Sequence, residues 1–373
     1  MIDVTFMYKF MDGTTITTNE FHAFSLKNAH KSKSSTLKII VPKDVWLQFG
    51  EYANVKVIVD FPDLGEKTIF YGGLVDRTAR YENNRIEYTL NFVDVTHSVF
   101  SYLQGKTYTA PVNILIRNFV EDMSSQTHSE WGQISDYDIA STRIDGSAFP
   151  TVRYVWDNRP LSSVLDELST PAYTGDKGTY YTWWIDEDRV FHWQPISRLK
   201  DTFTWNIDLS EYYSITPSIG LKGVVNQVIV YGGLDLNNNP IYVKKDDIRS
   251  ISIYGVKSKL ISYPSIADKL KKLYEDDINN GTLDNEEFRR RVKNIALIKA
   301  DQILEGYKSF NVAYEFTIPF QFVPIGAKLN FTNVPQNINE LESYDLYSDT
   351  VEYVVRRNKC YTVVRAVQEG ELR

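Results

Sequence analysis

The first 104 residues alternate apolar and polar side chains in short runs, and this period of two constrains the fold more than any other feature. Residues 86–92, IEYTLNF, place Ile, Tyr, Leu and Phe on one side and Glu, Thr and Asn on the other. Comparable runs occur at DVTFMYKF, STLKIIVP, ANVKVIVDF and KTIFYGGLV, with turn signals such as DG, PD and NN between them. Regularly spaced short strands predict a β-barrel or sandwich in this part of the chain.

The period changes at Pro111. Residues 111–123 carry apolar side chains at helical spacing, behind a proline at the first-turn position that it tolerates. A polar stretch at 124–150 predicts a loop, and a second helix follows in RPLSSVLDELS. The run YYTWWIDEDRVFHWQP then predicts a hairpin whose strands flank an acidic turn at Asp186–Asp188. Residues 105–202 are therefore predicted to form a compact α/β domain inserted after a first β domain at 1–104.

Strand patterns resume at residue 203 and are interrupted once more. TFTWNI, VVNQVIVYGG and RSISIYG predict strands, and so do AYEFTIPF, AKLNFTNV, TVEYVVRR and KCYTVVRAV near the end. Between these two groups, residues 264–307 have the spacing of two helices separated by NNG. We therefore predict a second β domain at 203–263 and 308–373, with a helical hairpin inserted at 264–307. The hairpin is expected to pack on the outside of the second β domain.

Composition excludes several functional classes. The formal net charge of -7 argues against wrapping nucleic acid, because that affinity comes mostly from Lys and Arg at phosphates. The single cysteine, Cys360, cannot form an internal disulfide and has no partner at zinc-ligand spacing. The 25 Tyr, 19 Phe and 7 Trp favour a β-rich protein that takes part in an assembly.

No targeting or membrane signal is found. No apolar run approaches the roughly 18 residues of a membrane span, and MIDVTFMYKFMDG lacks the basic-then-apolar order of a signal peptide. We expect a soluble protein made in a cytoplasm, without membrane insertion.

The candidates for catalysis all have a simpler structural explanation. Asp94 and His97 could form a carboxylate-oriented base, but the sequence places no nucleophile or second acid beside them, so we interpret residues 94–110 as a hinge between two domains. Carboxylates for glycan cleavage are available at two places, which are Asp186, Glu187 and Asp188, and Asp276 and Asp277. Turns and helix ends need polar residues at both places. The histidines and glycines fit no metal or phosphate motif, so no enzyme activity, metal or cofactor is expected.

Several phrases resemble the baseplate hub proteins of contractile-tailed phages and the tail-associated proteins of long non-contractile tails. They are FYGGLVDR, the strand end YTLNFVD at 88–94, GKTY at 105–108 before the helix at Pro111, RPLSSVLDEL with the hairpin after it, VVNQVIVYGG, and PIGAKLNF with CYTVVRAV. The phrases follow the order of that family over nearly the whole chain. The hairpin at 264–307 is longer than the helix that the family has there.

The resemblance implies a mainly β fold with α+β insertions. In this fold a tube-like β-barrel domain occurs twice within one chain. It implies a homotrimer whose six barrels adapt the six-fold tail tube to a three-fold spike or tip and line a channel through which DNA passes. The implied partners are a tail tube or distal tail protein, a spike or tip protein, a tape-measure protein and peripheral baseplate proteins. The location would be the virion tail tip or baseplate, assembled in the host cytoplasm.

Two other functions remain open at this stage. One is a tail-associated cell-wall hydrolase, and the other is a carbohydrate-binding β protein that uses Trp183, Trp184 and Trp193 as stacking platforms. Strand alternation would place the first two of these rings on opposite faces. For partner binding, the charged face of the helical hairpin provides the candidates Arg289, Arg290 and Arg291.

Overall fold

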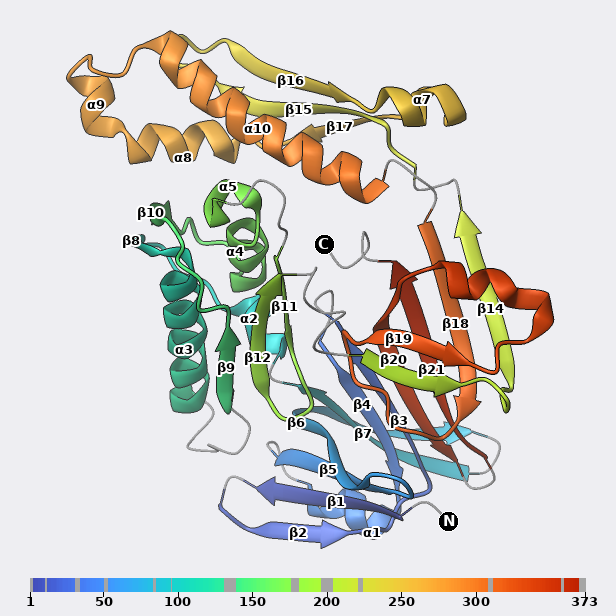
Figure 1. The fold of residues 1–373 in the computed structure, drawn as a ribbon. Helices are drawn as coiled ribbons and strands as arrows, with labels where there is room; N and C mark the ends of the chain where they lie inside the picture. Colours follow the sequence, from blue (N-terminus) through green and yellow to red (C-terminus); the bar gives the residue numbers. More distant parts are fainter. Residues whose placement is uncertain are drawn as a thin grey trace.

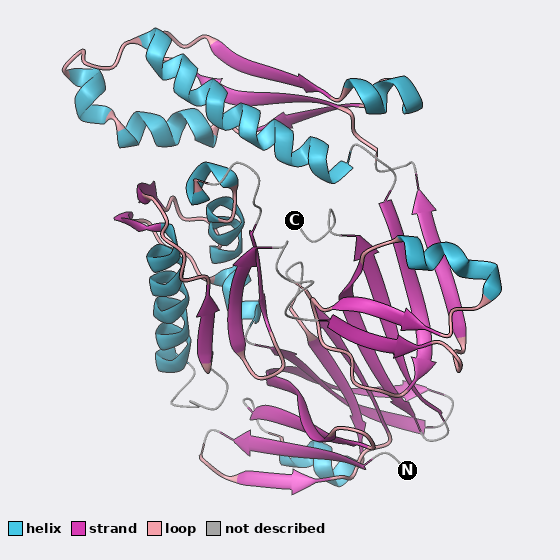
Figure 2. Ribbon diagram, viewed as in Figure 1, coloured by secondary structure: helices cyan, strands magenta, loops and turns pink. Residues whose placement is uncertain are grey.

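The computed structural model is mainly β, with most of its helices in two parts (Figures 1 and 2). It describes residues 3–10, 12–30, 34–49, 53–82, 85–94, 96–130, 139–175, 181–195, 204–220, 224–307, 311–356 and 359–368. For description we divide the described chain into four bodies, of which the two β bodies share one sheet. We call them the first β body (3–94), the α/β unit (96–195), the second β body (204–220 with 311–368) and the sheet–helix unit (224–307).

The first β body consists of the strands that the alternation predicts. They are β1 (Asp3–Phe10), β2 (Thr15–Thr18), β3 (Ala23–Ala29), β4 (Thr36–Val41), β5 (Ala53–Phe61), β6 (Gly65–Glu82) and β7 (Arg85–Asp94), with helix α1 (Lys43–Gln48) between β4 and β5. In β5 the side chains of Val55, Val57 and Val59 are fully buried, and the residues between them are more exposed. The period of two thus places one face of each strand in the core.

The second β body is assembled from two separate parts of the chain. Its elements are β13 (Thr204–Asp208), β14 (Ser214–Gly220), β18 (Asn311–Pro319), β19 (Lys328–Thr332), the 3-10 helix η2 (Gln336–Ser343), β20 (Leu346–Arg356) and β21 (Lys359–Gln368). The strands TFTWNI, AYEFTIPF, AKLNFTNV, TVEYVVRR and KCYTVVRAV are confirmed here.

The two β bodies are hydrogen-bonded to each other through β20 and β3, which pair antiparallel. Within the described residues this joins thirteen strands into one sheet, in the order β14-β18-β21-β20-β3-β4-β7-β6-β5-β1-β2, with β19 paired to β20 and β13. The side chains of both bodies also belong to one apolar core. Because this order has two ends, β14 and β2, in the described part of the chain, the two closed barrels stay a prediction.

The α/β unit contains most of the predicted elements and a core rich in tryptophan. It comprises α2 (Thr96–Ser101), β8 (Thr107–Pro111), α3 (Val112–Glu130), β9 (Ser141–Ile144), β10 (Thr151–Val155), α4 (Leu161–Leu168), α5 (Pro171–Thr174), β11 (Tyr181–Ile185) and β12 (Val190–Pro195). Both predicted helices and the hairpin are confirmed.

The predicted loop at 124–150 is only partly right. Helix α3 continues to Glu130, and β9 pairs parallel with β12. Polar side chains lowered the apparent periodicity of this stretch, although a helix can carry such residues on its solvent face. Residues 131–138 of the predicted loop lie outside the described residues.

The sheet–helix unit forms around a sheet of its own. It contains β15 (Gln227–Leu234), β16 (Pro240–Asp246), α7 (Ile248–Tyr254), β17 (Ser258–Ser262), α8 (Ser265–Leu273), α9 (Glu275–Asn279) and α10 (Asn285–Tyr307). The strand order is β16-β15-β17. Val228 and Val230 of β15 share a buried cluster with Val292 and Ala296 of α10, so the helices cover one face of this sheet (Figure 1).

Two expectations about this region are corrected. The strand VVNQVIVYGG was assigned to the second β domain, but it pairs with β16 and β17. The helices α8 and α10 were expected on the outside of the second β domain, but they contact β15 and β16 of their own sheet and β10 and α5 of the α/β unit. An apolar stripe is buried on whichever apolar surface is nearest, and β15 provides one. The predicted domain boundaries themselves stay a prediction.

The run RSISIYG is helix α7 and not the predicted strand. Asp247 precedes the helix, and its Oδ1 accepts a hydrogen bond of 2.8 Å from the backbone N–H of Ser250. An aspartate in this N-cap position satisfies a backbone donor that would otherwise lack a partner. The capping interaction therefore outweighs the alternation of Ser and Ile.

No helix in the described ranges is both long enough and apolar enough to cross a membrane.

Candidate functional site

Three of the bodies meet at a small polar cavity. Its volume is about 20 Å³, enough for roughly one water molecule. The first β body contributes Asn28, Ser35 and Asp94 to its lining, the turn between β11 and β12 contributes Asp186, Glu187 and Arg189, and the second β body contributes Ile325. The predicted acidic turn and the predicted hinge residue Asp94 therefore lie at one place, although the sequence separates them by some ninety residues.

Asp94 closes β7 and begins the connection to α2. Its Oδ2 accepts a hydrogen bond of 2.9 Å from the Thr96 hydroxyl, and its backbone N–H donates to the Ser35 carbonyl oxygen at 3.1 Å. Its Oδ1 is buried and has no hydrogen-bond partner among the described residues. Burial raises the pKa of Asp94 to about 6, against the opposing effect of hydrogen bonds from Ser35 and Thr96.

Glu187 reaches the same cavity from the α/β unit. Its Oε1 is likewise buried without a described partner. Burial raises the pKa of Glu187 to about 7, although a hydrogen bond from the backbone of Ile325 favours the charged form. Two carboxyl groups thus share a small cavity that disfavours negative charge on either of them.

Asp186 organises the turn between β11 and β12. Its Oδ1 accepts from the backbone N–H groups of Asp188 at 3.0 Å and Val190 at 2.9 Å. Its Oδ2 lies 2.7 Å from Nε2 of the buried His192, which stacks on Trp184. The interpretation of this acidic cluster as a turn is confirmed, since its first carboxylate, Asp186, accepts hydrogen bonds from the turn itself.

The other catalytic candidates lie apart from this turn. His97 is exposed on the short helix α2. Asp276 and Asp277 are exposed on α9, at the far end of the sheet–helix unit (Figure 1). Among the residues that the structure describes, no three His, Cys, Asp or Glu side chains are grouped to hold a metal ion.

The tryptophans proposed as a glycan platform are inside the protein. Trp183 and Trp193 belong to the core of the α/β unit, and Trp184 belongs to the core that the β bodies share. Trp183 donates to Asp166 at 2.9 Å and Trp193 to the Ser169 hydroxyl at 2.9 Å. A buried ring has no free face for a sugar, so this interpretation of the three residues is wrong.

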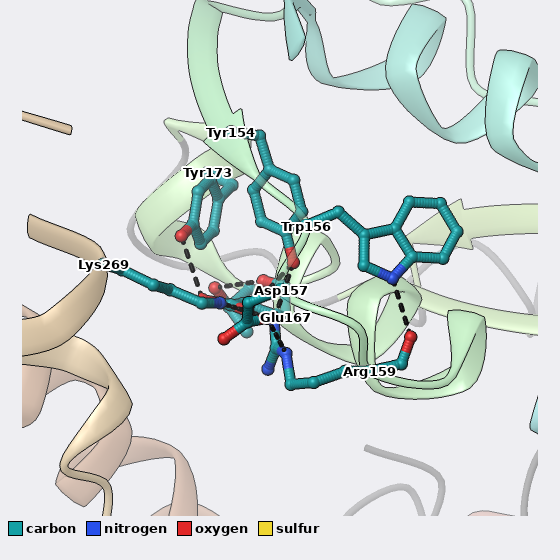
Figure 3. Close-up of polar contacts among 8 residues, drawn as sticks. Tyr154, Trp156, Asp157, Arg159, Glu167, Tyr173 and Lys269 are labelled. Atoms are coloured by element: carbon teal, nitrogen blue, oxygen red, sulfur yellow. Dashed lines mark hydrogen bonds and ion pairs between the residues drawn. The ribbon is translucent and has the colours of Figure 1, made fainter. Parts of the chain in front are cut away.

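A second junction joins the α/β unit to the sheet–helix unit through one carboxylate, Glu167 of α4 (Figure 3). Its Oε2 accepts hydrogen bonds from Lys269 of α8 at 2.7 Å and from Tyr154 at 3.1 Å, and it also contacts the Arg159 guanidinium. Its Oε1 accepts from Tyr173 at 3.0 Å. Arg159 is held in turn by Asp157, at 2.7 Å.

The charges at this junction compensate one another. Burial alone would raise the pKa of Glu167, but Lys269, Arg159 and Lys299 of α10 hold it well below its usual range. Burial lowers the pKa of Lys299, with Glu167 opposing that shift. A buried carboxylate with several cations and two tyrosine hydroxyls needs no further ligand. The network therefore joins the α/β unit to the sheet–helix unit.

The three arginines proposed for partner binding differ in their surroundings. Arg289 donates to the buried Asp235 at 2.6 Å and so ties the start of α10 to the turn after β15. Arg291 donates to Glu287 at 2.8 Å, and its guanidinium lies over the Tyr274 ring. Arg290 also contacts Glu287, at 2.6 Å, but keeps 65% of its side chain exposed. Partner binding by these three residues stays a prediction, and Arg290 is the most accessible of them.

Sequence reasoning missed the Glu167 network. Glu167 and Lys269 are 102 residues apart, and each lies in an ordinary amphipathic helix. One signal was available, because Glu167 lies directly beside the apolar positions of α4. A charge in this position needs a partner when the helix is buried on more than one side.

Comparison with known proteins gives matches in structure only. No family model matches the sequence, and no curated protein matches it. The fold is similar to that of the 43 kDa tail protein of prophage MuSo2 from Shewanella oneidensis, with a TM-score of 0.60, 9% identity, and coverage of 99% of this chain and 100% of that one. It is also similar to a tail protein from Neisseria meningitidis, with a TM-score of 0.55, 9% identity, and coverage of 99% and 97%.

A third similar structure is the prophage tail protein gp18 from Listeria monocytogenes. Its TM-score is 0.50 at 10% identity, with coverage of 97% of this chain and 94% of that one. At these identities the three matches establish a shared fold along nearly the whole chain, from the first β body to the second.

Proposed function

We propose that this chain is a structural hub protein of a phage-type tail, without enzyme activity. Three copies form a ring of six barrel-like β bodies, which adapts a six-fold tail tube to a three-fold spike or tip and leaves a channel for DNA. The observation that supports this most is the end-to-end similarity of fold to phage tail proteins from Shewanella oneidensis and Neisseria meningitidis. A fold alone does not determine function, so the assembly itself has to be measured.

Two features of the chain agree with this role. The β20–β3 pairing joins the two β bodies through one sheet and one apolar core. The net charge of -7 disfavours tight binding of DNA that has to pass through. The further partners in the proposal are a tube or distal tail protein, the spike or tip protein, a tape-measure protein and peripheral baseplate proteins. The location is the virion tail tip or baseplate, after assembly in the host cytoplasm.

The proposal is tested by the mass and shape of the assembly. Light scattering coupled to size exclusion should give a trimer, either for the pure chain or when the tube and spike proteins of the same phage are co-expressed. Electron microscopy of that species should show a ring with a central channel. A dimer or tetramer under every condition would refute the proposed hub.

The arginines of α10 allow a separate test of partner binding. Arg290→Ala should leave the melting temperature nearly unchanged, because exposed ion pairs contribute about 0–1 kcal/mol, while it weakens attachment of a peripheral partner. The matched control is Lys293→Ala, an exposed residue on the same helix. Equal attachment by both variants would remove Arg290 from the proposal.

A further inference from the structure

The sheet–helix unit has two ends of different character. At one end, Asn226 accepts a hydrogen bond of 2.7 Å from the backbone N–H of Lys257 and donates one of 2.7 Å to the Gly255 carbonyl oxygen. At the other end, Asp235 binds Arg289. Strand β15 runs between them, and its 8 residues span about 25 Å at the usual rise per residue. Helices α7 and α9 therefore lie at opposite ends of the unit, as Figure 1 shows.

The end formed by α7 and β17 is apolar and basic. Four aliphatic side chains within thirteen residues expose more than half of their surface, which are Ile248 at 80%, Ile253 at 61%, Val256 at 59% and Leu260 at 67%. Residues 248–260 also include Arg249, Lys257 and Lys259 and no acidic residue, and the flanking residues 244–247 add two lysines and two aspartates. We call this segment the basic end. Aliphatic groups gathered in this way are typical of a surface that another protein covers.

The edge of the sheet adds a second reason for a partner at the basic end. Strand β17 pairs with β15 on one side, and its other edge has no pairing strand among the described residues. An exposed edge presents backbone donors and acceptors that favour contact with another chain. The lysines at 257 and 259 are the kind of residue that keeps such an edge from pairing indiscriminately.

The opposite end is acidic. Residues 275–287 contain six acidic residues and no basic one, and the last helical turn of α8 before them carries Lys271 and Lys272. Glu275, Asp276 and Asp277 are all exposed on α9. Three arginines follow these acidic residues and are engaged within the unit, since Arg289 binds Asp235 and both Arg290 and Arg291 bind Glu287. Arg290 nevertheless keeps 65% of its side chain exposed. We call residues 275–287 the acidic tip.

We propose that the basic end of one copy docks on the acidic tip of the next copy of the same chain. The two surfaces have complementary charge and lie at opposite ends of one unit, so the contact joins two different surfaces and repeats head to tail. Such a contact closes into a ring when its rotation fits the number of copies. The inference rests on the proposed ring assembly, and it names the surfaces that hold neighbouring copies together.

Charge reversal tests the contact. Lys257→Glu with Lys259→Glu should weaken self-association by at least about tenfold, because like charges facing each other at an interface are strongly unfavourable. Lys43→Glu with Lys67→Glu, two exposed lysines of the first β body, changes the net charge equally and should have little effect. Adding Glu275→Lys and Asp276→Lys to the first variant should restore assembly, since the charges are then exchanged.

A change without charge gives an independent measurement. Leu260→Ser should also weaken self-association, and circular dichroism should show an unchanged fold, because the Leu260 side chain is mostly exposed in the single chain. Raising the ionic strength should weaken self-association of the wild-type chain. It should have less effect on the double variant Lys257→Glu with Lys259→Glu, because the attraction between opposite charges is absent there.

The possible failures can be told apart. If the chain trimerises and the 257/259 variant behaves like the 43/67 control, this inference is wrong and the hub proposal stands. If the 257/259 variant dissociates and the exchange at 275/276 does not restore it, the basic end binds something other than the acidic tip, and the inference is equally wrong. If the chain never self-associates, even with its tail partners, both proposals fail.

Discussion

Two of the contacts between the bodies of this chain differ in construction. Where the β bodies meet, β20 and β3 pair at seven positions, and the side chains on both sides belong to one apolar core. Where the α/β unit meets the sheet–helix unit, Lys269 reaches across to Glu167, which Arg159 holds from its own side. The first contact is spread over a strand, whereas the second converges on one carboxylate.

The difference predicts how each contact fails. A shared apolar core loses free energy in proportion to the surface and volume removed, so single substitutions weaken it by degrees. A buried ionic contact fails more abruptly, because removing one partner leaves the other charges buried without compensation. We therefore expect the two β bodies to unfold together and the sheet–helix unit to be released separately when its ionic contact is broken.

Removing the central carboxylate should have the largest effect. Glu167→Ala leaves Lys269, Arg159 and the nearby Lys299 without their anion, and we expect a loss of about 3–5 kcal/mol in the free energy of unfolding. Differential scanning calorimetry should show a new low-temperature transition while the β bodies remain folded. Glu121→Ala, at an exposed glutamate of α3, is the control and should cost less than about 0.5 kcal/mol. A single shifted transition in Glu167→Ala would contradict separate release.

A cavity at the seam between the β bodies should cost less and act on both of them. Leu26 of β3 is fully buried and lies opposite Tyr353 of β20. Leu26→Ala should lower the free energy of unfolding by about 3 kcal/mol, because it removes apolar contacts and leaves a cavity. Denaturant titration should move the unfolding of both β bodies to a lower midpoint without separating them. Two resolved β transitions would show that the seam is not a shared core.

The junction cavity predicts the pH dependence of stability. The folded-state pKa values of Asp94, about 6, and Glu187, about 7, are raised above the ordinary values of 3.8 and 4.5. The two protonated carboxyl groups therefore contribute their full stabilisation of the folded state at a pH below their ordinary pKa values. This stabilisation is lost as the pH rises through the folded-state pKa values of 6 to 7. Between about pH 8 and about pH 5, the free energy of unfolding should increase by roughly 1–3 kcal/mol.

The variants Asp94→Asn and Glu187→Gln identify the groups responsible. Each substitution should reduce the increase in the free energy of unfolding between about pH 8 and about pH 5. Each variant should also be at least as stable as the wild type near pH 8, because it lacks one of the buried charges. Below about pH 4 the trend should reverse, since the pKa of Glu167 is lowered and its contribution disappears when it is protonated. Melting curves across this range provide the measurement. An unchanged slope in both variants would mean that other groups titrate.

The smallest predicted effect is the loss of one hydroxyl at the seam. The Tyr353 Oη accepts from the Val323 backbone N–H and donates to the Val323 carbonyl oxygen, both at 3.1 Å. Tyr353→Phe should cost about 1–2 kcal/mol, since two buried backbone groups lose their partner. Denaturant titration against Tyr81→Phe, whose ring is exposed, measures the difference. Equal midpoints would show that Val323 finds another partner.

Local patterns in the sequence were enough to predict the strands of the β bodies and the hairpin of the α/β unit. DVTFMYKF and ANVKVIVDF are strands because their alternation matches the pleat of a sheet with one buried face. The pattern misled at RSISIYG, where the cap provided by Asp247 favours a helix. Alternation of apolar and polar residues indicates which side chains share one face of an element. It does not indicate which groups form hydrogen bonds with the backbone.

Pairing and packing between segments far apart in the sequence could not be predicted from local patterns. Nothing local indicates that VVNQVIVYGG pairs with β16 and β17, because a buried strand presents similar residues to any sheet. Asp94 and Glu187 were considered separately, and the cavity that joins them forms only when three bodies pack together. The Trp183 and Trp193 rings were considered as a surface because their number was visible in the sequence and their burial was not.

The β20–β3 seam also has a consequence for how the chain is made. The Ser25 hydroxyl donates to Glu352 across this seam at 2.7 Å, although 327 residues separate them. At ordinary rates of translation, β3 emerges from the ribosome roughly 15–65 s before β20 is synthesised. During that interval the edge of β3 has no strand to pair with, and such an edge can pair with another nascent chain. The same backbone groups that later join the two β bodies therefore expose the growing chain to mispairing until its last strands are synthesised.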